Sequence, residues 1–329
     1  MSNSRQPMGP RALVEGAFLA AIAALLAVSS YYLIPYISLF LPTPIAILVY
    51  RRGMTAGGLA ALVAAVLAAI LGGNPVISIL VISAGGIGLA LGELLRQGRS
   101  SSTAVVVASA VGTVMSGLVA LATLYLFGVN PVTNTVQMFQ ESWKAAASLY
   151  ERAGVPKEQL QAVGSFLAHW IPLLFPAGLV AAAAVSALAN FWLVRVVMRR
   201  LGNSLPGLPP FATWRIPAAA AWIWVAVAAA GMFVRWGGAA LAAVASASYL
   251  LSLAFLMQGL AVSWQFLARY EVPPWLRVAL LLFLATAPFS LLILLGLGLM
   301  DTWLDFRSRW RNGSKPGPGT GSSRGTGAR

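Results

Sequence analysis

Long apolar runs with almost no charge follow one another through most of this chain. Several exceed the roughly 18–20 apolar residues that an α-helix needs to cross a lipid bilayer, and the run 54–71 contains no charged residue. Only 9% of the residues are charged and 59% are hydrophobic, whereas a soluble domain carries about 25% charged residues. The sequence therefore predicts an all-α protein, a polytopic bundle of transmembrane helices.

The apolar runs predict nine spans, or eight if one of them does not cross. Their approximate ranges are 12–34, 39–50, 54–71, 75–95, 103–127, 166–197, 217–234, 237–267 and 275–300. Six crossings bring the chain back to its starting side at the basic segment 195–200. Three more would leave a basic tail on the opposite side, against the usual charge bias. Both counts stay open on the sequence.

The turn Arg51-Arg52-Gly53, between two apolar segments, sets the predicted orientation. Two arginines are unfavourable in hydrocarbon, so this turn must reach water. Basic residues in short loops mark the cytoplasmic side, which predicts a plasma-membrane protein with a cytoplasmic N-terminus. The net charge of +14 has the same explanation, because the Lys and Arg residues lie in loops and in the tail. A nucleic-acid partner is therefore not expected.

Composition also predicts the domain organisation. A Gly/Pro-rich linker at 201–215 separates a six-span domain, 1–200, from C-terminal membrane segments, 216–311, and the tail 312–329 is expected to be disordered. Within the first domain, the charged stretch 132–165 carries an apolar face at helical spacing. We expect an external amphipathic element there, lying on the membrane or capping the bundle. It either covers a site or is only a structural loop.

The short segment 39–50 is broken at its start by Pro42 and Pro44. About a dozen helical residues cover roughly 18 Å, less than the hydrocarbon thickness. Irregular backbone at this depth is tolerated only inside protein or beside a cavity. The segment 38–44 is therefore a candidate cavity wall, and the alternative is a plain loop that feeds a tilted helix.

A few polar groups near the predicted outer face are candidates for binding a small solute. They are Tyr31, Tyr32, Asn74, Tyr125 and His169, together with the deeper Asn190. Each has a structural alternative, because aromatic residues form belts at membrane interfaces and a buried Asn usually bonds a neighbouring helix. Gln258 is interpreted like Asn190, and Glu15 and Glu93 are interpreted as ion-pair partners at the cytoplasmic edge.

Motifs for catalysis are absent from the sequence. It contains no GxxxxGK[ST], HExxH or GxSxG pattern. With no cysteine and a single histidine, thiolate and multi-histidine metal sites are excluded. We therefore expect no catalytic activity, no metal and no cofactor, and we expect no convergence of charged or His side chains in the middle of the membrane.

The first half of the chain resembles the S component, the membrane-embedded substrate-binding subunit of energy-coupling-factor (ECF) vitamin transporters. The resemblance rests on the Ala-xxx-Ala spacing of the first span, the proline-led short second span and the Gly/Ala-rich third span. It implies that Ala17, Ala20, Ala21 and Ala24 dock a coupling transmembrane subunit, which works with separate ATPases. It also implies binding of a small molecule of unknown identity.

Nearly the whole chain resembles the YybS-like bacterial membrane proteins, a family of unknown function. The shared features are the segments 13–16 and 44–53, Gln258-Gly259-Leu260, and the ending that runs from Asp301 to Arg307. The extra C-terminal spans depart from the six-span S components. Two functions are thus predicted, a small-solute-binding subunit in the lipid bilayer or, alternatively, a scaffold or regulator of cell-envelope machinery.

Overall fold

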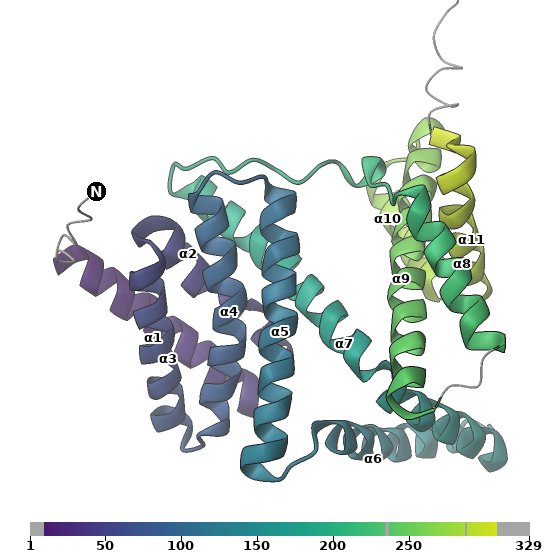
Figure 1. Ribbon diagram of the computed structural model, residues 1–329, viewed down its shortest axis with the longest axis horizontal. Coiled ribbons are helices and arrows are strands. Elements are labelled where there is room, and N and C mark those ends of the chain that lie inside the picture. The colour runs from purple at the N-terminus through teal and green to yellow at the C-terminus, as the bar shows by residue number, and fades with distance from the viewer. Residues whose placement is uncertain (1–9, 234–236, 287, 308–329) are drawn as a thin grey trace, which may run out of the picture. The chain divides into compact units, whose positions relative to one another are not determined.

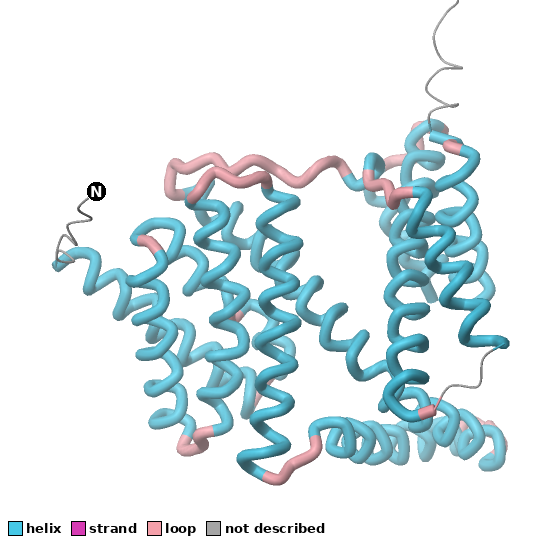
Figure 2. Tube along the Cα trace, viewed as in Figure 1, coloured by secondary structure: helices cyan, strands magenta, loops and turns pink. Residues whose placement is uncertain are grey.

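The protein is seen in a computed structural model that describes residues 10–233, 237–286 and 288–307. Every regular element in these ranges is a helix, which confirms the all-α prediction (Figures 1 and 2). The helices are α1 (Pro10–Tyr32), η1 (Pro35–Phe40), α2 (Pro42–Arg52), α3 (Met54–Gly72), α4 (Val76–Arg96), α5 (Ser101–Phe127), α6 (Pro131–Arg152), α7 (Lys157–Arg200), η2 (Phe211–Thr213), α8 (Ala218–Phe233), α9 (Gly238–Arg269), α10 (Pro274–Thr286) and α11 (Pro288–Leu304).

The chain divides into two compact units. Unit 1 holds residues 1–208 and 237–246, and unit 2 holds residues 209–236 and 247–329. The division after Leu208 falls inside the Gly/Pro-rich segment 201–215, while the first turns of α9 group with unit 1. The predicted disordered tail, 312–329, lies outside the described residues.

Fewer helices qualify as membrane spans than the eight or nine predicted. Within the described residues, six helices are long and apolar enough to cross a bilayer: α1, α3, α4, α5, α7 and α9. A seventh span results if α10 and α11, which are bent by more than 40° at their junction, count as one. The predicted spans at 39–50 and 217–234 correspond to α2, with 11 residues, and α8, with 16. Both fall below the length that hydrocarbon requires.

Small residues face inward on α3 and large apolar residues face outward. On α3, Ala56, Ala60, Ala64 and Ala68 are buried at four-residue spacing, whereas Leu62, Val66 and Ile70 are exposed. Helices in lipid gain little from hiding large apolar side chains and associate instead through close packing of small ones. The sequence of α3 therefore places its alanines against α1 and α4, and leaves its bulky side chains where lipid would lie.

The shortest α-helix described, α2, is the most enclosed element of unit 1. Every residue from Leu41 to Val49 is buried. On α4, a Cβ atom at Gly88 would lie 2.6 Å from the carbonyl oxygen of Pro42, and one at Gly92 would lie 2.5 Å from that of Ala46. These two glycines let the backbones of α2 and α4 touch. The helix too short to span a membrane is thus surrounded by helices that are long enough.

Basic residues gather at one end of unit 1. Glu15 on α1 pairs with Arg51, at 2.5 Å, and with Arg52, at 2.7 Å, at the end of α2. At the end of α4, Arg96 pairs with Glu93 at 3.0 Å, and its guanidinium lies beside Gly53. The predicted ion-pair roles of Glu15 and Glu93 are thereby confirmed. Ends of helices remote in sequence meet here because each carries charge that hydrocarbon would exclude.

At the other end of unit 1, α6 leaves the end of α5 at a steep angle and forms a helical hairpin with the start of α7 (Figure 1). Gly128 ends α5 with a positive φ of 67°, and the side chain of Asn130 caps α6 by accepting from the N–H groups of Val132 and Thr133. The predicted amphipathic element at 132–165 is therefore not a separate insert. Its second half is the first part of α7, a continuous 44-residue helix from Lys157 to Arg200.

In unit 2, α9 and α11 pack backbone against backbone. A Cβ atom at Gly259 would lie 1.8 Å from the carbonyl oxygen of Leu294, and one at Gly298 would lie 1.9 Å from that of Phe255. No other residue fits at these two positions without moving the helices apart. The indole N–H of Trp224 on α8 donates to Ser252 on α9 at 2.9 Å, which ties a third helix to the pair.

Candidate functional site

Three of the predicted binding residues meet at the end of unit 1 opposite the basic end. The amide of Asn74, in the turn between α3 and α4, donates to the hydroxyl of Tyr31 at 3.0 Å. The hydroxyl of Tyr32 donates to the carbonyl of Gly72 at 2.7 Å, and the two tyrosine rings are 4.9 Å apart. These exposed contacts fasten α1 to the α3–α4 turn. The sequence placed the three residues on one side, but their bonds to one another were not predicted.

Tyr125 and His169 do not join this cluster. Tyr125, near the end of α5, is 80% exposed. His169, within α7, is also exposed, and its ring centre lies 6.2 Å from that of Trp170. Their predicted association with Tyr31, Tyr32 and Asn74 is therefore not seen.

Asn190 is fully buried and its amide is occupied by protein partners. Its side-chain nitrogen donates to the carbonyls of Leu39, at 2.7 Å, and Ser186, at 2.6 Å. Its oxygen accepts from the hydroxyl of Thr43 at 2.6 Å. Asn190 therefore satisfies the irregular backbone where η1 meets α2, as buried polar groups require. This arrangement leaves no free group for a solute, which corrects its assignment as a binding residue. The segment 38–44 is held by protein instead of forming an open wall.

The alanines proposed to dock a coupling subunit divide into two pairs. Ala20 and Ala24 are 1% and 0% exposed, packed in the core between α1 and α3. Ala17 is exposed and Ala21 is partly exposed. Because α1 uses one edge of its small-residue stripe to pack within unit 1, only Ala17 and Ala21 remain accessible to a partner.

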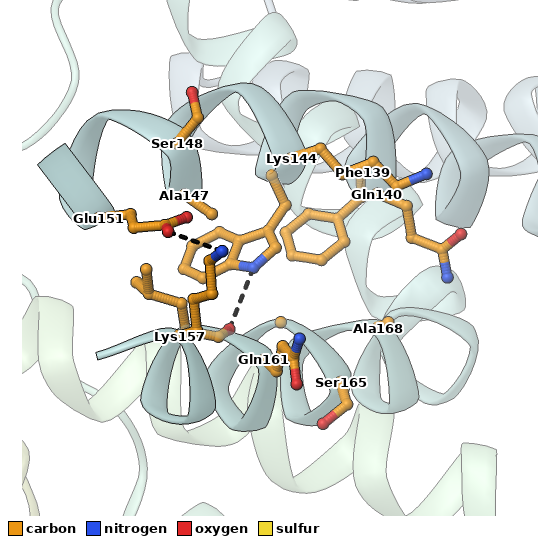
Figure 3. Close-up of a pocket in the computed structure, with 13 residues that line it drawn as sticks. Phe139, Gln140, Lys144, Ala147, Ser148, Glu151, Lys157, Gln161, Ser165 and Ala168 are labelled. Atoms are coloured by element: carbon orange, nitrogen blue, oxygen red, sulfur yellow. Dashed lines mark hydrogen bonds and ion pairs between the residues drawn. The ribbon is translucent and has the colours of Figure 1, made fainter. Parts of the chain in front are cut away.

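A groove of about 560 Å³ lies between α6 and the first turns of α7 (Figure 3). Its floor is aromatic, because Phe139 stacks on Trp143 with ring centres 6.1 Å apart. The indole N–H of Trp143 donates to the carbonyl of Leu160 at 3.2 Å, which fixes the ring. A Cβ atom at Gly164 would lie 2.3 Å from the indole nitrogen, so the ring lies flat on α7 only because that residue is glycine.

Polar side chains line the rim of this groove. Lys144 and Gln140 lie on α6, and Gln161 and Ser165 face them from α7 (Figure 3). At the far end, the ammonium of Lys157 pairs with Glu151 at 2.9 Å. Within the described residues Lys144 has no ion-pair partner. Ligand pockets are typically about 300–1,000 Å³ and combine an apolar lining with a few polar groups, and the groove meets this description.

The sequence identified this groove only in part. The apolar face that includes Phe139, Trp143 and Ala147 was read from helical spacing. The opposing wall was not, because no face was predicted for the helix expected to begin at Pro156, which carries Gln161 and Gly164. Gly164 is the one local signal in the sequence of this wall, because a glycine on a helix lets a large ring such as that of Trp143 pack against the backbone.

A second polar cluster lies in unit 2. Arg307 is 3% exposed and its guanidinium pairs with the carboxylate of Asp301 at 2.6 Å. It also donates to the carbonyls of Ala212 and Trp214, both at 2.8 Å. Gln258, on α9, donates to Asp301 at 3.2 Å and accepts from the backbone N–H of Ile216 at 2.8 Å. The cluster thus fastens the segment 212–216 to α9 and α11.

This cluster lies at the end of α11, so the expectation that no charged side chains converge in the middle of the membrane stays a prediction. Asp301 and Arg307 are both buried, and they meet Gln258 from a segment more than forty positions away. The signal in the sequence was a polar residue inside a long apolar run, at Gln258, and an acidic residue at the end of another. The Asp–Arg pairing neutralises the charge, so the cluster holds no free acid or base pair of the kind that proton chemistry uses.

No three His, Asp or Glu side chains in the described ranges come together in a way that could hold a metal ion. The groove between α6 and α7 is the candidate site. Its aromatic floor offers apolar contact, its amides offer hydrogen bonds, and Lys144 offers one positive charge.

The helices, their lengths and their lipid-like outer surfaces define a polytopic α-helical membrane protein. The chain belongs to a family of predicted membrane proteins of unknown function, DUF2232, whose sequence profile matches residues 21–302. This range includes most of both units and confirms the expected membership of an uncharacterised membrane family. No curated protein and no solved structure matches the chain.

Proposed function

We propose that this protein is a binding subunit of the plasma membrane that takes up a small ligand in the α6–α7 groove and has no catalysis of its own. The observation that carries the proposal is the groove, with its fixed aromatic floor and the ammonium of Lys144 at its rim. The basic end of unit 1 is assigned to the cytoplasm by the positive-inside rule. The groove, at the other end, then faces outward, and the N-terminus lies inside.

The resemblance to ECF S components supplies the partners for this proposal. A binding subunit without an energy source needs a coupling transmembrane subunit and ATPases. The exposed small residues Ala17 and Ala21 on α1 are the positions that such a partner would approach, since small side chains let helix backbones come close.

The ligand part of the proposal is tested by filling the groove. Ala147 lines it, whereas Ala145, on the same helix, is exposed and does not. The full chain and the variants Ala147→Trp and Ala145→Trp are extracted gently, and the retained small molecules are identified by mass spectrometry. We expect a molecule that is retained by the parent and by Ala145→Trp and lost from Ala147→Trp. Equal retention by all three would refute the groove as the site.

The partner part is tested by co-purification. Ala17→Leu and Ala21→Leu should release a bound coupling subunit, whereas Ala110→Leu, at an exposed alanine of α5, should not. Unchanged assembly in both α1 variants would count against this docking face.

The alternative function is a scaffold or regulator of cell-envelope machinery. It is favoured by the closed interior around α2, where Asn190 and Thr43 are bonded to each other and offer nothing to a solute. A pull-down that returns envelope proteins and no ATPase, with no molecule retained in the groove, would select this alternative.

A further inference from the structure

We propose that the occupant of the α6–α7 groove is an anionic phospholipid of the surrounding bilayer, held by its headgroup at Lys144 and by an acyl chain on Trp143. This inference rests on the proposed function, because it names the class of ligand for the same site. Three observations carry it: where the groove lies, how its charge is balanced, and how its floor is built.

The groove lies at the level where a bilayer meets water. The chain leaves the end of α5 at Gly128, runs through α6, and enters the membrane again along α7. Helix α6 leaves the end of α5 at a steep angle instead of continuing its direction (Figure 1), as an interfacial amphipathic helix does. Large apolar side chains near the groove are exposed, among them Met138, Val163 and Phe166. Lipid is thus the most concentrated ligand within reach.

The residues that line the groove carry one more positive charge than negative charge. Among its lining residues are two lysines and one glutamate, and Lys157 is already paired with Glu151. The remaining cation, Lys144, is exposed on α6 one turn from Gln140. Glu141 lies one turn before Lys144, but no ion pair joins the two in the described structure. An anionic group would restore neutrality, and the amides of Gln140 and Gln161 can donate to its oxygens.

The floor suits an acyl chain better than a sugar or a peptide. The Phe139 and Trp143 rings lie nearly parallel, 18° apart, and form a flat apolar surface. The indole N–H is already used by the Leu160 carbonyl, so the floor offers no hydrogen-bond donor from its rings. Small residues on both walls, Ala147 and Ala168, leave room along it. A ligand with one charged end and a long apolar part matches this layout.

The test uses the full chain in nanodiscs of phosphatidylcholine with a minor fraction of lipid brominated on its acyl chains, either phosphatidylglycerol or phosphatidylcholine. Bromine quenches nearby tryptophan fluorescence, and the difference between the parent and Trp143→Phe isolates the signal of Trp143. We expect stronger quenching of Trp143 by brominated phosphatidylglycerol than by brominated phosphatidylcholine. Lys144→Gln should weaken this preference about five-fold, as one basic residue near an anionic surface contributes about 1 kcal/mol.

Arg152→Gln is the matched control, since Arg152 is an exposed cation on α6 that does not line the groove, and it should leave the preference unchanged. Native mass spectrometry of protein released from the same nanodiscs should show retained phosphatidylglycerol that is lost in Lys144→Gln. This second measurement keeps the test valid if Trp143→Phe loosens the hairpin.

Equal quenching by the two lipids, or a preference that survives Lys144→Gln, would overturn the inference. Displacement of the lipid signal by soluble glycerol phosphate would show that the site selects the phosphate from water, and would overturn the membrane source. In either case a molecule lost only from Ala147→Trp would leave the proposed binding function standing. If the groove variants change neither lipid nor any retained molecule, the proposed function fails as well.

Discussion

Single polar residues hold together the irregular parts of this membrane protein. Asn190 bonds the break between η1 and α2, and Arg307 bonds the segment that precedes α8. In hydrocarbon or in a packed interior, a backbone carbonyl outside a helix has no water to bond with. One side chain that carries several donors satisfies several such groups. These residues are therefore expected to matter for stability more than for ligand binding.

Replacing Asn190 tests this role. Asn190→Leu should destabilise unit 1 by about 1–3 kcal/mol, because the buried Thr43 hydroxyl loses its partner and the Leu39 carbonyl keeps only the longer bond from the Ser186 hydroxyl, at 3.4 Å. The unfolding transition of the purified protein in detergent measures the loss. Asn134→Leu, at an exposed position of α6, is the control and should change little. An unchanged transition for Asn190→Leu would mean that the break is held by packing alone.

The buried ion pair of unit 2 gives a second prediction. Asp301→Leu should cost about 3–5 kcal/mol, because it leaves Arg307 buried without its counter-charge. The double variant Asp301→Leu with Arg307→Met should recover part of this loss, although the carbonyls of Ala212 and Trp214 then lose their donor.

The exposed pair of Arg215 and Asp305 serves as the comparison for this pair. Arg215→Met should cost only about 0–1 kcal/mol, as surface ion pairs do. Unfolding in detergent is measured for the parent, Asp301→Leu, the double variant and Arg215→Met. A double variant no more stable than Asp301→Leu would contradict the explanation that the loss comes from an unpaired buried charge.

Helices in this protein pack through small residues at fixed crossing points. Alanines line the inner faces of α1 and α3, and glycines mark the closest approaches of α4 to α2 and of α9 to α11. This pattern explains why α2, with its large Ile, Leu and Val side chains, can be enclosed. Its neighbours supply the space that it needs.

Gly92 provides the test at the level of the element. Gly92→Val would drive a side chain into the carbonyl of Ala46, 2.5 Å from the nearest Cβ position, and should destabilise unit 1 by at least the roughly 1–3 kcal/mol typical of overpacking. Gly117→Val, on α5, where a Cβ atom meets nothing within 4 Å, is the control. Similar thermal stability of the two variants would show that α2 and α4 can separate without loss.

At the scale of the whole molecule, the arrangement of charge predicts how the protein sits in the membrane. The turns at 51–53 and 97–100 and the segment 201–208 carry or adjoin six arginines of unit 1, namely Arg51, Arg52, Arg96, Arg99, Arg199 and Arg200. Ser101 bonds the carbonyl of Pro206 at 2.7 Å and Arg195 bonds that of Leu205 at 3.2 Å. These segments therefore lie together at one end, which the charge bias assigns to the cytoplasm.

Because the chain contains no cysteine, single introduced cysteines report this orientation without background. Arg99→Cys and Asn203→Cys should be protected from a membrane-impermeant thiol reagent in intact cells, and Val129→Cys, at the other end of α5, should react. Lysed cells are the control and should expose all three. Reaction at Arg99→Cys together with protection at Val129→Cys would invert the orientation and place the groove inside the cell.

The sequence alone determined that this is an all-helical membrane protein, because long uncharged apolar runs have no other stable fold, and it located the amphipathic element and the basic turns. The structure supplied the helix bounds on which the count of six or seven candidate spans rests, and only the tertiary structure showed that α2 is enclosed. Length and hydropathy are properties of one segment, but enclosure depends on neighbours, so α2 was taken for a crossing helix when its companions surround it. Asn190, Gln258 and Arg307 acquired their roles in the same way, from hydrogen-bond partners far away in the chain. The groove could not be predicted from the sequence either, because its lining residues come from two helices and only the face of α6 was recognised.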